Sequence, residues 1–257
     1  MTSIDERRRV SFDSTADRYD AARPSYPEAL FDDLIALARI RADAVVLEVG
    51  AGTGKATLPL ARRGIEVIAI EPSANMAAVL RAKVDGLRVA IAGTTFEAYR
   101  ADRAADVVLS AQAFHWVDPS VRYVKAADVL APGGALALLR NDKGELDPGL
   151  ASDLAGAYAE HFADGPGPHS ARHERSQIAA EIDASGRFGA VTVRTYPWSA
   201  TYSAADYIRL LETYSDHAVL KPSRSQPLYR AIARAIERRG GSITIPYVAA
   251  LHLAEVR

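Results

Sequence analysis

The sequence predicts an α/β fold in which helices cover a doubly wound, mostly parallel sheet of seven strands. Through the first half of the chain, apolar runs rich in β-branched residues alternate with amphipathic segments of helical length. That order is typical of parallel strands joined by crossover helices. The run Val45–Val49 leads into Gly50, Gly52 and Gly54 and then into a helical segment, which is the strand, turn and helix of a nucleotide-binding corner.

The first half of the chain supplies five of the predicted strands. A helix over Ser25–Ile40 precedes them and opens with Ser25 and Glu28 at the spacing of a capping box. The helix after the glycine turn, Lys55–Arg63, is ended by Gly64. The remaining elements are a strand Ile65–Ile70, a helix capped by Ser73, strands Leu87–Ala92 and Ala105–Ser110, a helix Pro119–Leu130 and a strand Gly134–Arg140.

The second half of the chain has a different order, because helices stand between its last strands. The predicted elements are helices Gly149–Phe162 and Ser170–Ile182, a strand Val191–Tyr196, helices Ala204–Leu220 and Ser225–Arg239, and a last strand Ile243–Val256. Helices inserted before the closing strand predict a helical cap.

The glycine turn departs from the dinucleotide-binding pattern. Counted from Gly50, the third glycine of Gly-x-Gly-x-x-Gly is replaced by Lys55. Glu48 precedes the turn and would repel a phosphate, so it favours a cationic ligand. Glu71 ends the next strand, where an acidic residue of this kind of fold binds ribose hydroxyls.

Three segments of the chain resemble class I S-adenosylmethionine-dependent methyltransferases. Glu48–Gly54 resembles their motif I, and the family's cofactor carries a sulfonium and an ammonium but no phosphate. Ala113–Asp118 resembles the fourth-strand signature of a bacterial and fungal small-molecule subgroup that includes relatives of trans-aconitate methyltransferase. Phe12–Pro27 resembles the leader of that subgroup, which folds over the cofactor.

The resemblance implies a set of cofactor contacts along the chain. Tyr19 and Arg23 are spaced to share one helix face and would receive the methionine carboxylate. The other implied contacts are Glu48, Gly50 and Gly52 at the turn, Glu71 at the ribose, Met76 beside the adenosine, Thr95 and Phe96 at the adenine, and Ala111 and Gln112 at the methionine part.

The acceptor side is predicted around His115. For a hydroxyl or amine acceptor, His115 is the candidate catalytic base, and for a carboxylate acceptor it would position or neutralise the acceptor instead. Trp116 is expected to face the acceptor pocket, while Trp198, Tyr214 and His217 are substrate candidates that core packing explains equally well.

A metal site is not expected. Asn141 and Asp142 end the fifth strand, where metal-dependent catechol methyltransferases hold magnesium, but the sequence offers no third oxygen ligand.

Composition limits the remaining classes of function. The net charge is −1 with both signs mixed, so no footprint for nucleic acid is visible. The absence of cysteine excludes disulfides and thiolate chemistry, and no apolar stretch reaches bilayer length. We therefore expect a cytoplasmic protein, monomeric or homodimeric, whose partner is a small-molecule acceptor rather than nucleic acid or membrane.

The expected division of the chain follows from these assignments. Residues 1–24 are expected to cover the cofactor, residues 25–142 to form the S-adenosylmethionine-binding core, and residues 143–188 to form a helical insertion. Residues 189–257 complete the core and contain the cap helices 204–239.

The predicted function is methyl transfer from S-adenosylmethionine to a small molecule by in-line displacement. An NAD(P)-dependent oxidoreductase shares the sheet, but the glycine spacing fails and no Tyr-x-x-x-Lys pair is present. A nucleic-acid methyltransferase would need an Asp/Asn-Pro-Pro-Tyr step after the fourth strand, which the chain lacks. A non-catalytic protein that binds S-adenosylmethionine is the other alternative.

Overall fold

The structure, a computed structural model, describes residues 16–161, 175–218 and 220–257. The chain divides into two compact units. The sheet unit comprises Ser25–Asn141, His173–Tyr196 and Val248–Arg257, and the helical unit comprises Met1–Pro24, Asp142–Arg172 and Pro197–Tyr247.

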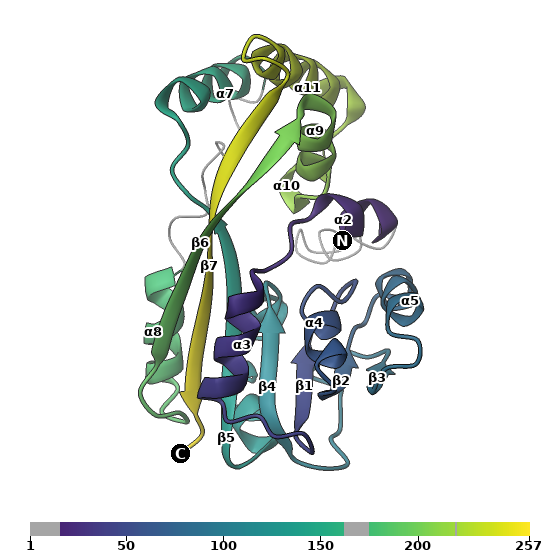
Figure 1. Ribbon diagram of the computed structural model, residues 1–257, viewed down its shortest axis with the longest axis vertical. Coiled ribbons are helices and arrows are strands. Elements are labelled where there is room, and N and C mark those ends of the chain that lie inside the picture. The colour runs from purple at the N-terminus through teal and green to yellow at the C-terminus, as the bar shows by residue number, and fades with distance from the viewer. Residues whose placement is uncertain (1–15, 162–174, 219) are drawn as a thin grey trace. The chain divides into compact units, whose positions relative to one another are not determined.

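A seven-stranded sheet organises the chain, with strand order β3-β2-β1-β4-β5-β7-β6 (Figure 1). The strands are β1 Val45–Val49, β2 Glu66–Ile70, β3 Val89–Ala92, β4 Ala105–Ala111, β5 Leu130–Lys143, β6 Thr192–Ser203 and β7 Ser242–Glu255. All five residues of β1 are buried, as expected for a central strand covered on both faces.

The sheet is mixed, and its first five strands are parallel, as a mostly parallel sheet predicts. β1 pairs in parallel with β2 and β4, β2 with β3, and β4 with β5. β7 runs antiparallel to β5, because Val256 N–H donates to the Gly134 carbonyl while Gly144 N–H donates to the Pro246 carbonyl. An antiparallel bridge joins Phe188 to Val256. β7 thus runs against the parallel strands β1 to β5.

The helices of the sheet unit form where apolar residues recur with helical periodicity in the sequence. They are α3 Glu28–Leu37, α4 Thr57–Arg62, α5 Ala74–Lys83, the short 3₁₀ helix η2 Phe114–Trp116, α6 Arg122–Asp128 and α8 Arg175–Ala184. The cap of α5 is confirmed, since Ser73 Oγ accepts from Met76 N–H at 3.1 Å. The capping box of α3 is wrong: its N-cap is Pro27, without a side-chain bond, and Glu28 instead accepts from Arg63 at 2.7 Å.

The helical unit has a hydrophobic core of its own. Its helices are α2 Ala16–Ala22, α7 Pro148–His161, α9 Ala204–Glu212, α10 Ser215–Ala218 and α11 Pro222–Glu237. Leu154, Leu210 and Ile232 lie fully buried in that core. The role of these helices as a cap stays a prediction.

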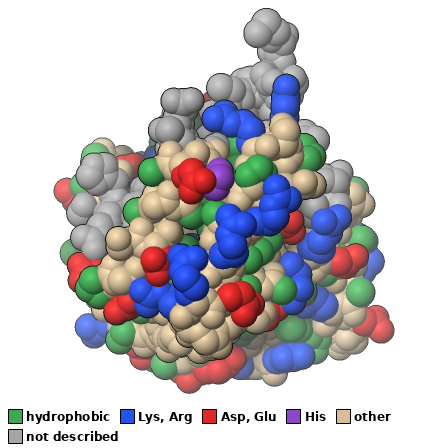
Figure 2. Space-filling model, turned by 90° about the horizontal axis from the view of Figure 1, so that it is seen from above, with side chains coloured by type: hydrophobic (Ala, Val, Ile, Leu, Met, Phe, Trp, Pro, Cys, Tyr) green, Lys and Arg blue, Asp and Glu red, His purple; other side chains and the backbone are tan. Residues whose placement is uncertain are grey.

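The outer side of α11 carries charge. Arg230 and Arg234 are exposed, whereas Leu228, Ile232 and Ile236 on the other side of the helix are buried. Figure 2 shows basic side chains on the upper face of the molecule with acidic and apolar side chains between them. The visible face therefore mixes both signs of charge.

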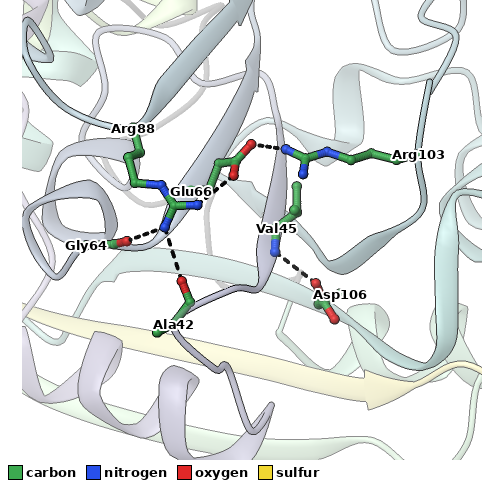
Figure 3. A network of polar contacts seen from close by, with 7 residues as sticks. All are labelled: Ala42, Val45, Gly64, Glu66, Arg88, Arg103 and Asp106. Carbon is green, nitrogen blue, oxygen red and sulfur yellow. Dashed lines mark hydrogen bonds and ion pairs between the residues drawn. The ribbon is translucent and has the colours of Figure 1, made fainter.

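A polar network lies at the end of the sheet where β1 and β2 begin (Figure 3). Glu66 pairs with both Arg88 and Arg103, and Asp106 accepts from Val45 N–H at 2.8 Å. These groups form hydrogen bonds and ion pairs within the network. We therefore expect the functional residues at the opposite end of the sheet, where the parallel strands end. Within the described ranges, no helix has both the length and the apolar character needed to cross a lipid bilayer.

Candidate functional site

The turn after β1 is fastened to β2 by its backbone. Gly50 N–H and Ala51 N–H both donate to the Ile70 carbonyl, at 2.9 and 3.0 Å. Gly50, Gly52 and Gly54 have φ values of 70°, 56° and 87°, a region that glycine enters at little cost. The sequence therefore folds into the predicted tight turn at the end of the strand.

The three glycines have different neighbours. A Cβ at Gly50 would lie 2.4 Å from Ala113 Cβ, and one at Gly54 would lie 2.5 Å from Leu80 Cδ1. A Cβ at Gly52 would meet nothing within 4 Å. The first and third glycines thus allow internal packing, while the second leaves open space at which a ligand can approach the backbone.

Glu48 places a buried carboxyl at the end of β1. Its exposed fraction is 1%, and Thr57 Oγ1 donates to its Oε2 at 2.6 Å. Its Oε1 is buried and has no hydrogen-bond partner among the described residues. Burial, with a smaller contribution from the charge of Glu71, raises the pKa of Glu48 to about 8, while the bond from Thr57 opposes the rise. A cation beside this carboxyl would fill the vacant acceptor, whereas a phosphate would be repelled.

Glu71 connects the ends of β1 and β2. Its Oε2 accepts from Gly52 N–H at 2.7 Å and its Oε1 accepts from Ser73 N–H at 2.8 Å. A carboxylate oxygen can accept more than one bond, so both oxygens remain able to accept from a ribose. The sequence did not predict the hydrogen bond to Gly52, because local sequence patterns do not indicate a contact between the ends of two separate strands.

The predicted adenine contacts lie in the sheet unit, largely within its core. Met76 and Phe96 have exposed fractions of 4% and 2%, and Phe96 packs in the main core cluster with Leu47 and Ile70. Thr95 Oγ1 accepts from a backbone N–H three residues later, at 3.3 Å. Met76 and Phe96 are therefore buried packing residues of the sheet unit. Their contact with adenine, and that of Thr95, stays a prediction.

Gln112 holds a strained backbone at the end of β4. Its φ is 59°, which is uncommon for a residue other than glycine. The backbone N–H donates to the Leu139 carbonyl at 3.0 Å, and Nε2 donates to the Asn141 carbonyl at 2.9 Å. Residues whose strained backbone is held by such hydrogen bonds are frequent at functional sites. Ala111, the other predicted contact here, is the last residue of β4.

His115 and Gln112 line a common pocket of about 120 Å³ within the sheet unit. His115 belongs to η2 and is exposed, with its ring 4.8 Å from that of Trp116. Phe114 anchors η2 by an edge contact with Tyr123 at 5.3 Å. Trp116 contacts His115 but is not among the residues that line this pocket.

Tyr19 and Arg23 meet as their spacing predicts. The Arg23 guanidinium lies 5.2 Å from the ring centre of Tyr19 and 4.2 Å from that of Tyr214, and it donates to the Thr213 carbonyl at 2.9 Å. All of these residues belong to the helical unit. Their assignment to the cofactor or the acceptor stays a prediction.

His217 and Trp198 have packing partners inside the helical unit. His217 Nε2 lies 2.9 Å from the Tyr158 hydroxyl, and Nδ1 lies 3.3 Å from that of Tyr229. Burial lowers the pKa of His217. Trp198 stacks on Tyr247 with ring centres 4.8 Å apart. These contacts give both residues a structural role, and contact with a substrate stays a prediction.

The end of β5 is held by protein contacts. Asn141 Nδ2 donates to the Ser25 carbonyl at 3.1 Å, and Asp142 is buried with 4% exposed. In the part of the chain that the structure describes, no three His, Asp or Glu side chains are grouped to hold a metal ion.

Comparison with known proteins supplies the family. A family model described as a methyltransferase domain matches residues 47–138, which span the turn, Glu71, Gln112 and η2. An uncharacterized methyltransferase of Mycobacterium tuberculosis is 44% identical over 136 residues, covering 53% of this chain and 54% of the relative. The chain thus spans about half the length of its mycobacterial relatives.

A fission-yeast relative is matched over more of its length. An uncharacterized methyltransferase-like protein of Schizosaccharomyces pombe is 30% identical over 200 residues, covering 77% of this chain and 74% of the relative.

Solved structures support the fold. A candidate type II methyltransferase from Anaeromyxobacter dehalogenans superposes with a TM-score of 0.67 at 23% identity, covering 91% of this chain and 97% of the other. Phosphoethanolamine N-methyltransferase 2 of Haemonchus contortus, solved with S-adenosyl-L-methionine, has a TM-score of 0.58 at 16% identity and covers 99% of this chain and 60% of its own. The domain match and the fission-yeast relative show that the chain belongs to the class I S-adenosylmethionine-dependent methyltransferases, and the solved structures show the Rossmann-like α/β fold.

Proposed function

We propose that this protein transfers a methyl group from S-adenosylmethionine to a small-molecule acceptor by in-line displacement. The observation that carries the proposal is the buried Oε1 of Glu48, which has no hydrogen-bond partner in the part of the chain that the structure describes. It lies at the strand end that leads into an open glycine position at Gly52. A buried carboxyl with an unfilled acceptor is costly unless a ligand completes it. A ligand that carries positive charge and no phosphate fits that requirement.

The residues of the sheet unit suit the parts of this cofactor. Glu48 would balance its positive charge, Gly52 would let its chain approach the turn, and Glu71 would accept from the ribose hydroxyls. Gln112, with its pinned backbone, would border the methionine part. When bound, the cofactor supplies a methyl carbon already activated by the sulfonium, so the protein has to hold, align and shield the reactants.

His115 would act on the acceptor. With a hydroxyl or amine acceptor, the imidazole takes the proton released as the acceptor atom bonds to the methyl carbon. With a carboxylate acceptor, no proton has to leave, and His115 orients the acceptor. The resemblance of Ala113–Asp118 to relatives of trans-aconitate methyltransferase supports a small-molecule acceptor.

Calorimetric titration with S-adenosylhomocysteine, followed by transfer of a radiolabelled methyl group to an acceptor panel, tests this proposal. Wild-type protein should bind, and Glu48→Gln should bind more weakly. Asp85→Asn, which changes an exposed carboxylate of the sheet unit, is the control and should bind like wild type.

Each alternative predicts a different result in these assays. Binding of NADH without binding of S-adenosylhomocysteine would favour the oxidoreductase. Tight S-adenosylhomocysteine binding without transfer to any acceptor would favour a non-catalytic binding protein.

A further inference from the structure

The pocket behind His115 contains charge that the methyl-transfer proposal does not use. Its described lining includes Arg122 from α6, Arg140 from β5, and Gln177 and Glu181 from α8. All of these residues belong to the sheet unit, so the described lining comes from one compact unit of the chain. Guanidinium groups that line a cavity are suited to carboxylate and phosphate groups.

The described lining of the pocket contains more cationic than anionic side chains. Arg122 Nη2 lies 2.5 Å from Glu181 Oε2, which also accepts from the Tyr123 hydroxyl at 2.9 Å. Glu181 is the one carboxylate among the described lining residues, against the two guanidinium groups of Arg122 and Arg140. The described lining therefore offers two guanidinium groups to an anionic ligand, one of them, that of Arg122, already held by Glu181.

Arg122, which lines the pocket, has one donor without a partner among the described residues. The Arg122 side chain is only 13% exposed. Its Nε is buried and has no hydrogen-bond partner among the described residues. A buried donor without a partner costs free energy that a bound acceptor group would recover. Glu181 engages only the Nη2 end of this guanidinium.

The walls of the pocket are held in place by the core. Ile182 of α8 is fully buried in the main core cluster, and Ile178 packs against the same cluster. Leu138 of β5 lies in this cluster and also lines the pocket. Because α8 is anchored in this way, Gln177 and Glu181 are presented from a fixed helix.

The volume limits what can enter. Pockets for drug-sized ligands measure roughly 300–1,000 Å³, whereas this pocket measures about 120 Å³. It can hold one end of a small molecule. We propose that it binds an anionic group, a carboxylate or a phosphate, of the acceptor, and that Arg122 and Arg140 select acceptors that carry such a group.

This inference rests on the proposed methyl transfer, because only that function makes the ligand an acceptor. Arg122 and Arg140 would serve as specificity-determining residues, while His115, at the same pocket, faces the reacting end. Glu181 holds Arg122 in place and opposes the bound anion.

Titration calorimetry with charged and neutral probes tests the inference on the full chain at low ionic strength. The probes are 4-hydroxybenzoate against 4-hydroxybenzamide, and glycerol 3-phosphate against glycerol. The charged member of at least one pair should bind more tightly than its neutral partner, and the preferred pair identifies the anionic group. If neither charged probe binds more tightly than its neutral partner, the inference is overturned.

Three variants and a control locate the binding. Arg140→Gln and Arg122→Gln should each weaken the charged probe by about ten-fold or more, the scale of one lost charge-assisted hydrogen bond. Glu181→Gln should tighten it, because a negative charge leaves the pocket. Arg100→Gln, an exposed arginine of the sheet unit outside this pocket, should leave it unchanged. The opposite signs at Glu181 and Arg140 cannot both result from a loss of folding.

Saturating S-adenosylhomocysteine separates this inference from the proposed function. Charged-probe binding that persists with the cofactor product bound supports a separate subsite. Displacement of the probe by S-adenosylhomocysteine would overturn it. A wild-type protein that binds the charged probe but not S-adenosylhomocysteine would refute the methyl-transfer proposal while the pocket itself still binds anions.

Discussion

The carboxylate of Glu71 accepts a hydrogen bond from the backbone N–H of Gly52 at 2.7 Å. Through this bond the acidic residue after β2 holds the middle glycine of the turn after β1, so the two predicted cofactor elements form one structural element. A change at either residue should therefore be felt at the other.

Replacing Glu71 by Ala should weaken S-adenosylhomocysteine binding by about 1–3 kcal/mol, the scale of a lost hydrogen bond to a charged group. The variant loses the predicted ribose acceptor and also releases Gly52. Calorimetric dissociation constants of Glu71→Ala and of the Asp85→Asn control provide the measurement. An unchanged constant for Glu71→Ala would place the ribose elsewhere.

The pair Gly52→Val and Gly50→Ala should separate a ligand-binding glycine from a packing glycine. At Gly52 a side chain enters open space, so the cost to folding should be about 1–2 kcal/mol from the left-handed backbone, while S-adenosylhomocysteine binding is lost. At Gly50 the added methyl collides with Ala113, so the loss of stability should be larger.

Thermal unfolding and calorimetry of both variants measure the two effects. Wild-type affinity in a folded Gly52→Val protein would contradict the assignment of the turn to the cofactor.

Glu48 should make the stability of the unliganded protein depend on pH. Its pKa is about 8 in the folded protein against an ordinary value of 4.5, so the folded state binds the proton more tightly. The contribution of Glu48 protonation to the free energy of unfolding is fully present below pH 4.5 and is lost as the pH rises towards 8. Above that pH, the free energy of unfolding no longer depends on this group. The slope from this group is at most about 1.4 kcal/mol per pH unit.

Urea unfolding of wild type and Glu48→Gln between pH 5 and 9 measures this dependence. The variant lacks the titrating group, so its stability relative to wild type should increase over that interval. A constant difference between the two proteins at all pH values would show that Glu48 is ionised when folded.

Replacing His115 by Ala should lower turnover more than it weakens the cofactor. His115 belongs to η2 and lines the pocket, and it has no assigned cofactor contact. Loss of a general base typically costs 10²- to 10⁴-fold in rate. Steady-state transfer rates, compared with S-adenosylhomocysteine affinity, measure the two effects, and equal losses would place His115 against the cofactor.

Several features of this protein were determined by local sequence. The glycines with positive φ, the buried strand before them and the serine cap of α5 depend on residues close together in the chain. The parallel half of the sheet followed because alternating strands and helices admit few arrangements. Glu48 was recognised because a carboxylate at the end of an apolar strand is a local signal.

Other features were decided only by the tertiary structure. The failed capping box shows why: Glu28 meets Arg63, 35 residues away, and that contact leaves no trace in the local pattern. The antiparallel β7, the bond from Gly52 to Glu71 and the pocket that joins Arg122, Arg140 and Glu181 likewise depend on pairings between distant segments. Local spacing sets φ, ψ and periodicity, whereas the charge balance of a cavity depends on which distant side chains the packed fold brings together.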